Sequence, residues 1–245
     1  MSGKMDHMAD LADTDHHLAH LAEAGQRLVR SVDGLTGDEW AAPSLLPGWS
    51  RAHVVAHLAL NAEGLGGVLR GEAERSPAPM YESQESRNDD IEELAGADHA
   101  ELRERLLAGT VSFPEAVQGL PADLWEGRFE RTRGGPTLPL RAAPLMRVRE
   151  IEIHHVDLDV GYSPDAWPPG FAEELVDGMV KRQQPDVGFL VRPLDADRTW
   201  EVGPVGDDAP VVTGPVAHLG WWLTGRPPSE QVSSSRGGLP QIGGW

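Results

Sequence analysis

Cysteine is absent from the 245-residue sequence. The chain therefore has no disulfide framework, no thiolate ligand for a metal and no cysteine nucleophile. Ligands for a bound metal would have to come from histidine, aspartate and glutamate. A metal site in this chain must be sought among those three residue types.

Positive charge and long apolar runs are also scarce. Lysine and arginine total 21 against 39 acidic residues, which gives a formal net charge of −18 and a surface that repels nucleic acids and anionic lipids. No stretch reaches the roughly 18 uncharged apolar residues that a membrane helix requires. We therefore expect a soluble, cytoplasmic protein that binds neither nucleic acid nor membrane, and a monomer is the expected oligomeric state.

Glycine and proline, 28 and 20 residues, are distributed unevenly and leave several stretches nearly free of helix breakers. Apolar residues recur there at intervals of three and four, which predicts helices. The expected helices cover residues 8–33, 51–65, 88–118 and 142–159, although the β-branched residues of the last segment are also compatible with a strand. We expect the third to be broken or kinked at Gly109 and Pro114, and residues 127–140 to form a loop or hairpin. Ser50 is placed to cap the second helix.

The pattern changes after Tyr162, where a proline-rich linker begins. One further helix, two strands and a terminal helix are expected at residues 171–183, 199–202, 210–213 and 216–225. The predicted fold class is α+β. A four-helix bundle over residues 1–162 is followed by a smaller α+β domain over residues 163–245.

Three side chains stand out by their spacing among the histidines and carboxylates of the chain. Glu150 and His154 lie one helical turn apart, so they share a face, and His57 lies on the inward side of the second helix. A carboxylate buried without a partner costs several kcal/mol. Two histidines and one glutamate make the ligand set of a catalytic zinc site with an open fourth position.

The same side chains could also lie in the bundle without a metal. Glu150 could pair with Arg147 or Arg149 while both histidines make ordinary hydrogen bonds. Glu152 and His155 have the Glu-x-x-His spacing of di-iron bundles, but the second helix supplies no matching pair, so this site is less favoured. A group of histidines in the first helix is expected to be solvated among aspartates rather than to bind a metal: His7, His16, His17 and His20.

Two segments resemble the metal-binding domain of mycothiol-dependent maleylpyruvate isomerases: LPGWSRAHVVAHLA (residues 46–59) and REIEIHHVDL (residues 149–158). That family belongs to the DinB-like four-helix group, which includes mycothiol and bacillithiol S-transferases. The segment GWWLTGR (residues 220–226) is similar to the end of the family's small C-terminal domain. The resemblance therefore spans nearly the whole chain and implies a DinB-like bundle.

The resemblance assigns roles to particular residues. The family's zinc ligands fall on His57, Glu150 and His154, and its two functional arginines fall on Arg87 and Arg226. We also consider Asp157, one turn beyond His154, as a residue that could orient a ligand imidazole. It could equally be a plain charge at the end of the helix.

The implied reaction is the cis–trans isomerisation of maleylpyruvate to fumarylpyruvate. A thiolate adds reversibly to the double bond, the resulting enolate rotates about a single bond, and elimination restores the thiolate. Because the chain has no cysteine, the thiol must come from a small molecule, which the resemblance implies is mycothiol, and zinc would lower its pKa. Arginines would bind the small anionic substrate. The alternatives are a mycothiol S-transferase acting on another electrophile and a non-catalytic metal- or ligand-binding module.

Overall fold

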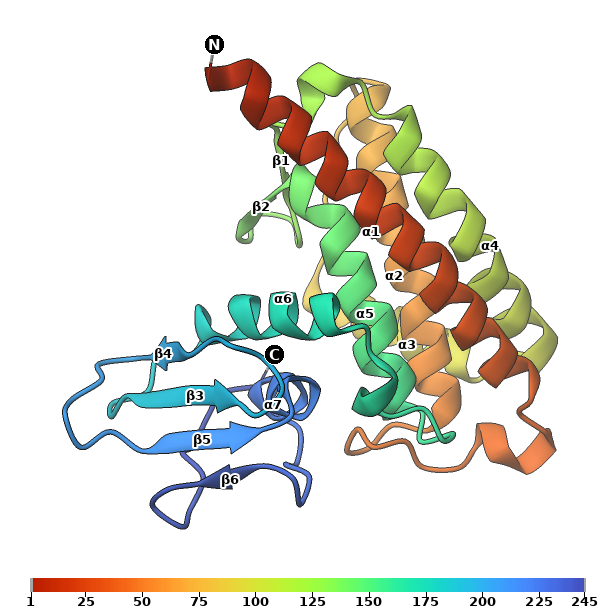
Figure 1. The fold of residues 1–245 in the computed structure, drawn as a ribbon. Helices are drawn as coiled ribbons and strands as arrows, with labels where there is room; N and C mark the ends of the chain where they lie inside the picture. The colour runs from red at the N-terminus through yellow and green to blue at the C-terminus, as the bar shows by residue number, and fades with distance from the viewer. Residues whose placement is uncertain (1, 245) are drawn as a thin grey trace. The chain divides into compact units, whose positions relative to one another are not determined.

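A computed structural model describes the backbone of residues 2–244 and the side chains of residues 13–244. The chain forms two compact units, residues 1–160 and residues 161–245. The first is mainly helical, and the second combines helices with a small sheet (Figure 1). This arrangement confirms the predicted α+β fold class.

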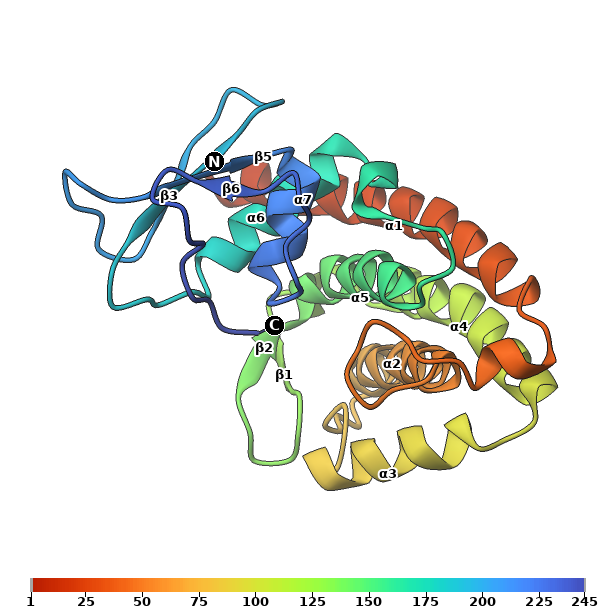
Figure 2. The same ribbon diagram turned by 90° about the horizontal axis from the view of Figure 1, so that it is seen from below.

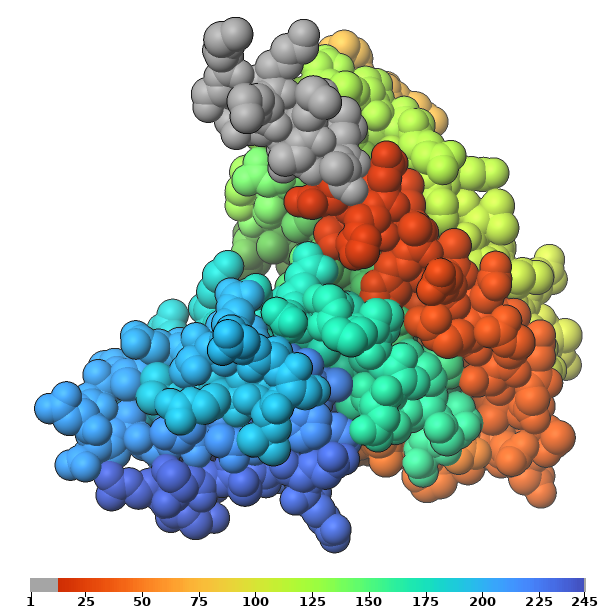
Figure 3. Space-filling model, viewed as in Figure 1, coloured from red at the N-terminus to blue at the C-terminus, as the bar shows by residue number. Residues whose placement is uncertain are grey.

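Four long helices build the first unit: α1 (Ser2–Asp33), α2 (Arg51–Ala73), α4 (His99–Gly119) and α5 (Ala143–Asp157). Helix α2 packs against α4 and α5, α1 packs against the same two helices, and the short helix α3 (Gln84–Ala95) lies beside α2 (Figure 2). Their apolar stripes meet in a common core, where each fully buried large side chain contributes about 1.5–3 kcal/mol. From Asp13 onward, the outer face of α1 is polar and forms part of the surface in Figure 3.

Helix α2 is longer than predicted. It ends at Ala73, whereas the sequence predicted an end at residue 65. The returning chain passes very close to this helix. A Cβ on Gly64 would lie 3.1 Å from Met80 Cγ, and one on Gly71 would lie 2.8 Å from the Ser76 carbonyl oxygen. These two glycines permit close packing and do not end the helix.

The expected third helix is in fact two helices, and its break lies elsewhere than predicted. Helix α3 ends at Ala95, and Asp98 caps α4 by accepting a 2.7 Å hydrogen bond from the Ala100 amide. Gly109 lies inside α4, where a Cβ would come within 2.7 Å of Ala62 Cβ on α2. Pro114 also lies inside α4. The prediction of a break at Gly109 or Pro114 was therefore wrong, because Gly109 provides a close helix contact.

The segment between α4 and α5 forms the hairpin anticipated from its glycines. Strands β1 (Arg128–Glu130) and β2 (Thr137–Pro139) pair antiparallel. The hairpin also holds residue 81: the Tyr81 amide donates to the Arg131 carbonyl at 3.0 Å, and the Arg133 amide donates to the Tyr81 carbonyl at 3.3 Å. The backbone at Tyr81 is thereby tied to the hairpin.

The second unit is built on a four-stranded sheet of order β4-β3-β5-β6, in which only β3 and β5 are parallel. Its strands and helices are α6 (Pro169–Val180), β3 (Phe189–Pro193), β4 (Trp200–Val202), β5 (Val211–Gly214), α7 (Val216–Leu223) and β6 (Ser233–Ser234). Helix α7 ends before Gly225, whose φ of +87° suits glycine. Both predicted helices and both predicted strands are present, whereas β3 and the short β6 were not predicted.

Candidate metal centre

The loop before α2 fixes the start of that helix against the end of α5. Ser50 caps α2, as predicted, by accepting a hydrogen bond from the His53 amide. Within the loop, Ser44 Oγ donates to the Trp49 carbonyl at 2.9 Å. The Leu45 amide donates to the Asp157 carbonyl at 2.8 Å, which joins the loop to the last turn of α5.

Arg51 completes this connection. Its Nε donates to the Leu158 carbonyl at 2.8 Å and its second terminal nitrogen donates to the Asp159 carbonyl at 2.7 Å. These carbonyls follow the last turn of α5, where backbone acceptors have no partner within the helix. The first turn of α2 is therefore held at one level relative to α5, and this level places His57 opposite Glu150 and His154.

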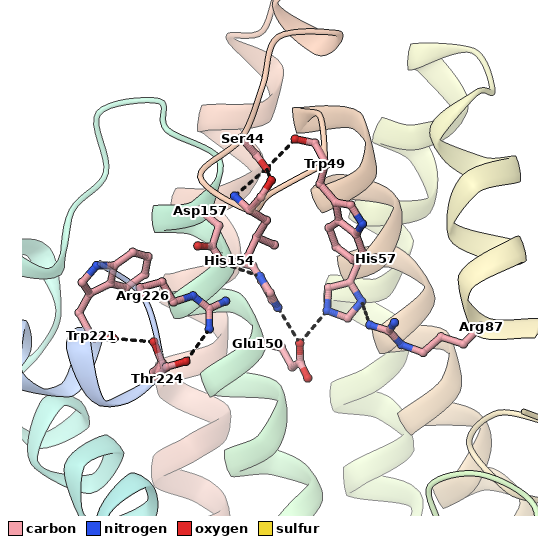
Figure 4. A network of polar contacts seen from close by, with 11 residues as sticks. Ser44, Trp49, His57, Arg87, Glu150, His154, Asp157, Trp221, Thr224 and Arg226 are labelled. Carbon is pink, nitrogen blue, oxygen red and sulfur yellow. Dashed lines mark hydrogen bonds and ion pairs between the residues drawn. The ribbon is translucent and has the colours of Figure 1, made fainter. Parts of the chain in front are cut away.

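The three predicted ligands meet at one carboxylate oxygen, Oε2 of Glu150, which both histidines approach (Figure 4). His57 Nε2 lies 2.8 Å from Glu150 Oε2, and His154 Nε2 lies 3.3 Å from the same oxygen. The two imidazole rings are nearly perpendicular, with centroids 4.7 Å apart. Among the residues that the structure describes, these three form the one group whose geometry could hold a metal ion, with ligand atoms within 4.8 Å of one another.

Burial and charge together set the protonation of the cluster. Burial lowers the pKa of His57 to about 4, so its imidazole is neutral at neutral pH. Burial acts to raise the pKa of Glu150, but His57 and His154 outweigh it and hold that pKa well below its usual value. A neutral imidazole beside an ionised carboxylate is the donor state that a divalent metal requires, so the cluster fits such an ion.

Asp157 holds the ring of His154, the third candidate ligand, by a hydrogen bond. Its Oδ2 accepts a 2.8 Å hydrogen bond from His154 Nδ1, and its side chain is fully buried. Burial alone would lower the pKa of His154, yet the hydrogen bonds to Asp157 and Glu150 raise it. With Nδ1 held by Asp157, Nε2 faces Glu150. A carboxylate behind a ligand histidine fixes the ring in this way in many metal sites.

Arg87 reaches the cluster from α3. Its terminal nitrogen donates to His57 Nδ1 at 3.1 Å, as Figure 4 shows. Because a guanidinium can only donate, His57 Nε2 carries the ring proton and donates it to Glu150. The Arg87 guanidinium also lies 5.7 Å from the centroid of the Tyr81 ring. Sequence reasoning placed Arg87 near the site, and the structure puts it in contact with a candidate ligand.

Arg226 belongs to the second unit, just after the end of α7. Its guanidinium lies 5.6 Å from the centroid of the Trp221 ring, and one terminal nitrogen donates to the Thr224 carbonyl at 3.3 Å. It is partly exposed. Both of these contacts are with residues of the second unit.

His20 and His155 pair with other protein groups. Glu152 is fully buried and pairs with α1, where His20 Nε2 lies 2.6 Å and an Arg27 nitrogen 2.8 Å from its Oε1. His155 Nε2 lies 2.8 Å from Ser31 Oγ. Glu152 and His155 thus face α1 and form no di-iron centre among the described residues. The expectation of solvated histidines was wrong for His17 and His20, which are buried or nearly so, and the side chain of His7 lies outside the described residues.

Sequence reasoning did not place Trp49 or Tyr81 beside the cluster, and it considered Glu150 rather than Asn61 as the partner of Arg147. The Trp49 ring centroid lies 5.7 Å from that of His57. Tyr81 interacts with Arg87, and Arg147, one turn before Glu150, donates to Asn61 Oδ1 at 2.8 Å. Asn61 lies one turn after His57, so its spacing gave a signal. Tyr81 gave none, because it comes from a loop that the hairpin positions.

The first unit is thus a helical bundle with a candidate metal centre, which is built from two histidines and one glutamate. Residues 21–159, more than half of the chain, match the family described as mycothiol maleylpyruvate isomerase N-terminal domain. The chain therefore belongs to this family.

Two solved structures resemble the chain over nearly its whole length. One is the crystal structure of the mycothiol-dependent maleylpyruvate isomerase, and the other is that of a histidine-to-alanine mutant of this enzyme. Each is 25% identical, with a TM-score of 0.85, over 95% of this chain and 97% of the other. No significant match is found among curated proteins. Within the described residues, no helix combines the length and apolarity needed to cross a membrane.

Proposed function

We propose that this protein is a metal- and mycothiol-dependent cis–trans isomerase that converts maleylpyruvate to fumarylpyruvate. The observation that carries the proposal is the convergence of His57, Glu150 and His154 on one point, in a fold that matches the isomerase structures along 95% of the chain. Family membership supports an enzyme that uses mycothiol. The particular substrate and reaction are our inference.

The three convergent residues would hold the metal, for which zinc suits two imidazoles and a carboxylate. Bound there, a divalent metal would lower the pKa of the mycothiol thiol, which supplies the nucleophile that a chain without cysteine lacks. Asp157 keeps the His154 ring turned toward Glu150. Trp49 covers one side of His57 and reduces the access of water to it.

The arginines supply positive charge, which is scarce in this acidic chain. Maleylpyruvate is a dianion, and the net charge of −18 opposes its approach. Local cations are needed to bind its carboxylates and to stabilise negative charge that develops on it during the reaction. Arg87 lies at the cluster and meets this need directly. We propose Arg226 as a second such cation, on the basis of the family resemblance of residues 220–226.

Metal analysis of the purified chain, followed by an absorbance assay with maleylpyruvate, tests this proposal. We expect one divalent ion per chain and isomerisation only when mycothiol is present, with the mycothiol concentration unchanged at the end. Consumption of mycothiol would indicate an S-transferase instead. Metal binding without any thiol-dependent turnover would contradict both enzymes and favour a binding module.

A further inference from the structure

Arg147 is a buried cation whose hydrogen bonds are incomplete. Its side chain lies on α5 one turn before Glu150 and is 1% exposed. One terminal nitrogen donates to Asn61 Oδ1 at 2.8 Å, and the other, also buried, has no hydrogen-bond partner within the described part of the chain. A buried donor without an acceptor destabilises the fold, and more strongly when it is charged. Such a group needs an explanation.

A second unpartnered guanidinium nitrogen lies in the same neighbourhood. Arg87 donates to His57 through a terminal nitrogen, but its Nε is buried and meets no acceptor among residues 13–244. Tyr81 is a neighbour of both arginines, because the Arg87 guanidinium lies 5.7 Å from the centroid of its ring and Tyr81 is close enough to Arg147 to affect the pKa of that arginine. Two donors therefore lack acceptors around one tyrosine.

The charges of this neighbourhood are also unbalanced. The carboxylate that acts on Arg147 is that of Glu150. Glu150 already accepts from His57 and His154, and it is a candidate metal ligand. Burial lowers the pKa of Arg147 only to about 10, so this side chain remains charged at neutral pH. The carboxylate near Arg147 is thus one that is already engaged by two histidines.

We propose that Arg147, Arg87 and Tyr81 form a subsite for one carboxylate group of the substrate, next to the candidate metal ligands. The inference rests on the proposed function in taking a dicarboxylate as the ligand. A carboxylate has two oxygens and four lone-pair directions, which match the two unpartnered N–H groups. A charge-assisted hydrogen bond is strengthened where water is excluded, as it is around Arg147.

The subsite also gives Arg147 a different role from Arg87. Asn61 holds one side of the Arg147 guanidinium, and Asn61 stands one turn after His57 on α2. Arg147 stands one turn before Glu150 on α5. The pair Asn61–Arg147 therefore forms a layer directly adjacent to the metal ligands and positions the carboxylate relative to them. We expect this layer to select substrates with a carboxylate at that distance from the reacting double bond.

Calorimetric titration of the full chain with maleate, a stable dicarboxylate with a cis double bond, tests the subsite in the presence and absence of zinc. We expect Arg147→Met to weaken maleate binding about tenfold to hundredfold, the value of one charge-assisted hydrogen bond. Metal content should stay unchanged. Arg147→Lys should retain part of the affinity. The matched control is Arg105→Met, which removes a guanidinium that is already paired with Glu63 in the same bundle, and it should bind maleate normally.

Wild-type affinity in a folded Arg147→Met protein would overturn the subsite, as would a wild-type chain that does not bind maleate. If Arg147→Met fails to fold, Arg147→Lys decides, because it keeps the charge but loses the second guanidinium donor and must weaken maleate binding as well. Equal competition by inorganic phosphate would overturn the assignment to a carboxylate. Arg147-dependent maleate binding in a chain that does not isomerise maleylpyruvate would refute the proposed function and leave the subsite standing.

Discussion

His57 joins the two halves of the candidate site, since it contacts Glu150 through one ring nitrogen and Arg87 through the other. We expect His57→Ala to lose both metal and activity. The bundle should stay folded, because removing a polar ring at the site leaves the leucine and valine core intact. Elemental analysis and circular dichroism measure the two effects.

The control for this change is His53→Ala, one turn earlier on α2, where the ring contacts the exposed Glu92. That variant should retain its metal. Full metal occupancy in His57→Ala would show that another residue is the ligand.

Arg226 has two possible roles, and the free energy that the side chain would contribute differs between them. As a cation near the end of α7 it would contribute only about 0.3–1 kcal/mol through the helix dipole. As a group that binds substrate charge it would contribute about 2–4 kcal/mol to the transition state, so Arg226→Ala would lower the rate about thirtyfold to thousandfold. Steady-state kinetics at equal metal content and equal Tm separates the two. Near-normal turnover would leave only the role at the helix end.

The candidate ligands could be predicted from the sequence because helical spacing alone places Glu150 and His154 on one face. The neighbouring Tyr81 could not, because its place depends on hydrogen bonds to a hairpin about fifty residues later in the chain. The role of Arg147 was hidden for another reason. Its pairing with Asn61 depends on the relative height of two helices, which no local pattern encodes.

Between helices, the contact of Arg51 with the end of α5 sets that relative height. We expect Arg51→Ala to lower the free energy of unfolding by about 1–3 kcal/mol, the range for hydrogen bonds from a charged donor. Metal affinity should fall as well, because His57 would no longer be held opposite Glu150. Urea unfolding and metal titration measure the two quantities. Arg141→Ala, which removes an exposed pair with Glu126, is the control and should change neither.

The packing of α1 on α5 should depend on pH through His155. Burial lowers the pKa of this histidine to about 4, against about 6.5 when unfolded, despite the nearby Glu152. The unfolded chain then binds more protons between these values, so stability falls as the pH drops from about 6.5 to about 4. This histidine accounts for up to about 3 kcal/mol of that loss.

Urea unfolding of the wild type and of His155→Gln across this pH range measures the effect of His155. Glutamine can still bond to Ser31 but does not titrate in this range, so the variant should lose less stability at acidic pH. Identical pH profiles would show that His155 does not titrate as expected.

The helices and strands show where local patterns fail. The second helix was expected to end at residue 65 but continues to Ala73, and Gly64 and Gly71 within it allow the chain at Ser76 and Met80 to pass closely. Strand β3 was missed although it lies inside the sheet, because its five residues end at a proline and follow a glycine-containing loop. In both cases tertiary contacts outweigh the propensity of the segment.

At the scale of the whole molecule, metal binding should stabilise the first unit, which contains all three candidate ligands. Zinc at about a hundredfold excess over its Kd would add about 2.7 kcal/mol. For a unit of this size that raises Tm by about 5–10 °C. Thermal scans with zinc or a chelator measure the shift. The same shift in His57→Ala would contradict binding at this cluster.

The shared oxygen of Glu150 has a further consequence, for the exchange of protons with solvent. Both His57 Nε2 and His154 Nε2 approach Oε2, and the hydrogen bonds of the cluster place protons between these atoms. An ion that binds all three residues takes the place of the proton between His154 and Glu150, while the neutral His57 ring keeps its one proton and moves it from Nε2 to Nδ1, so metal and hydrogen ions compete at His154. Uptake of the metal therefore acidifies a weakly buffered solution. Its apparent affinity weakens as acidity increases, and the rate of loading depends on how fast the imidazole of His57 passes its proton from one ring nitrogen to the other.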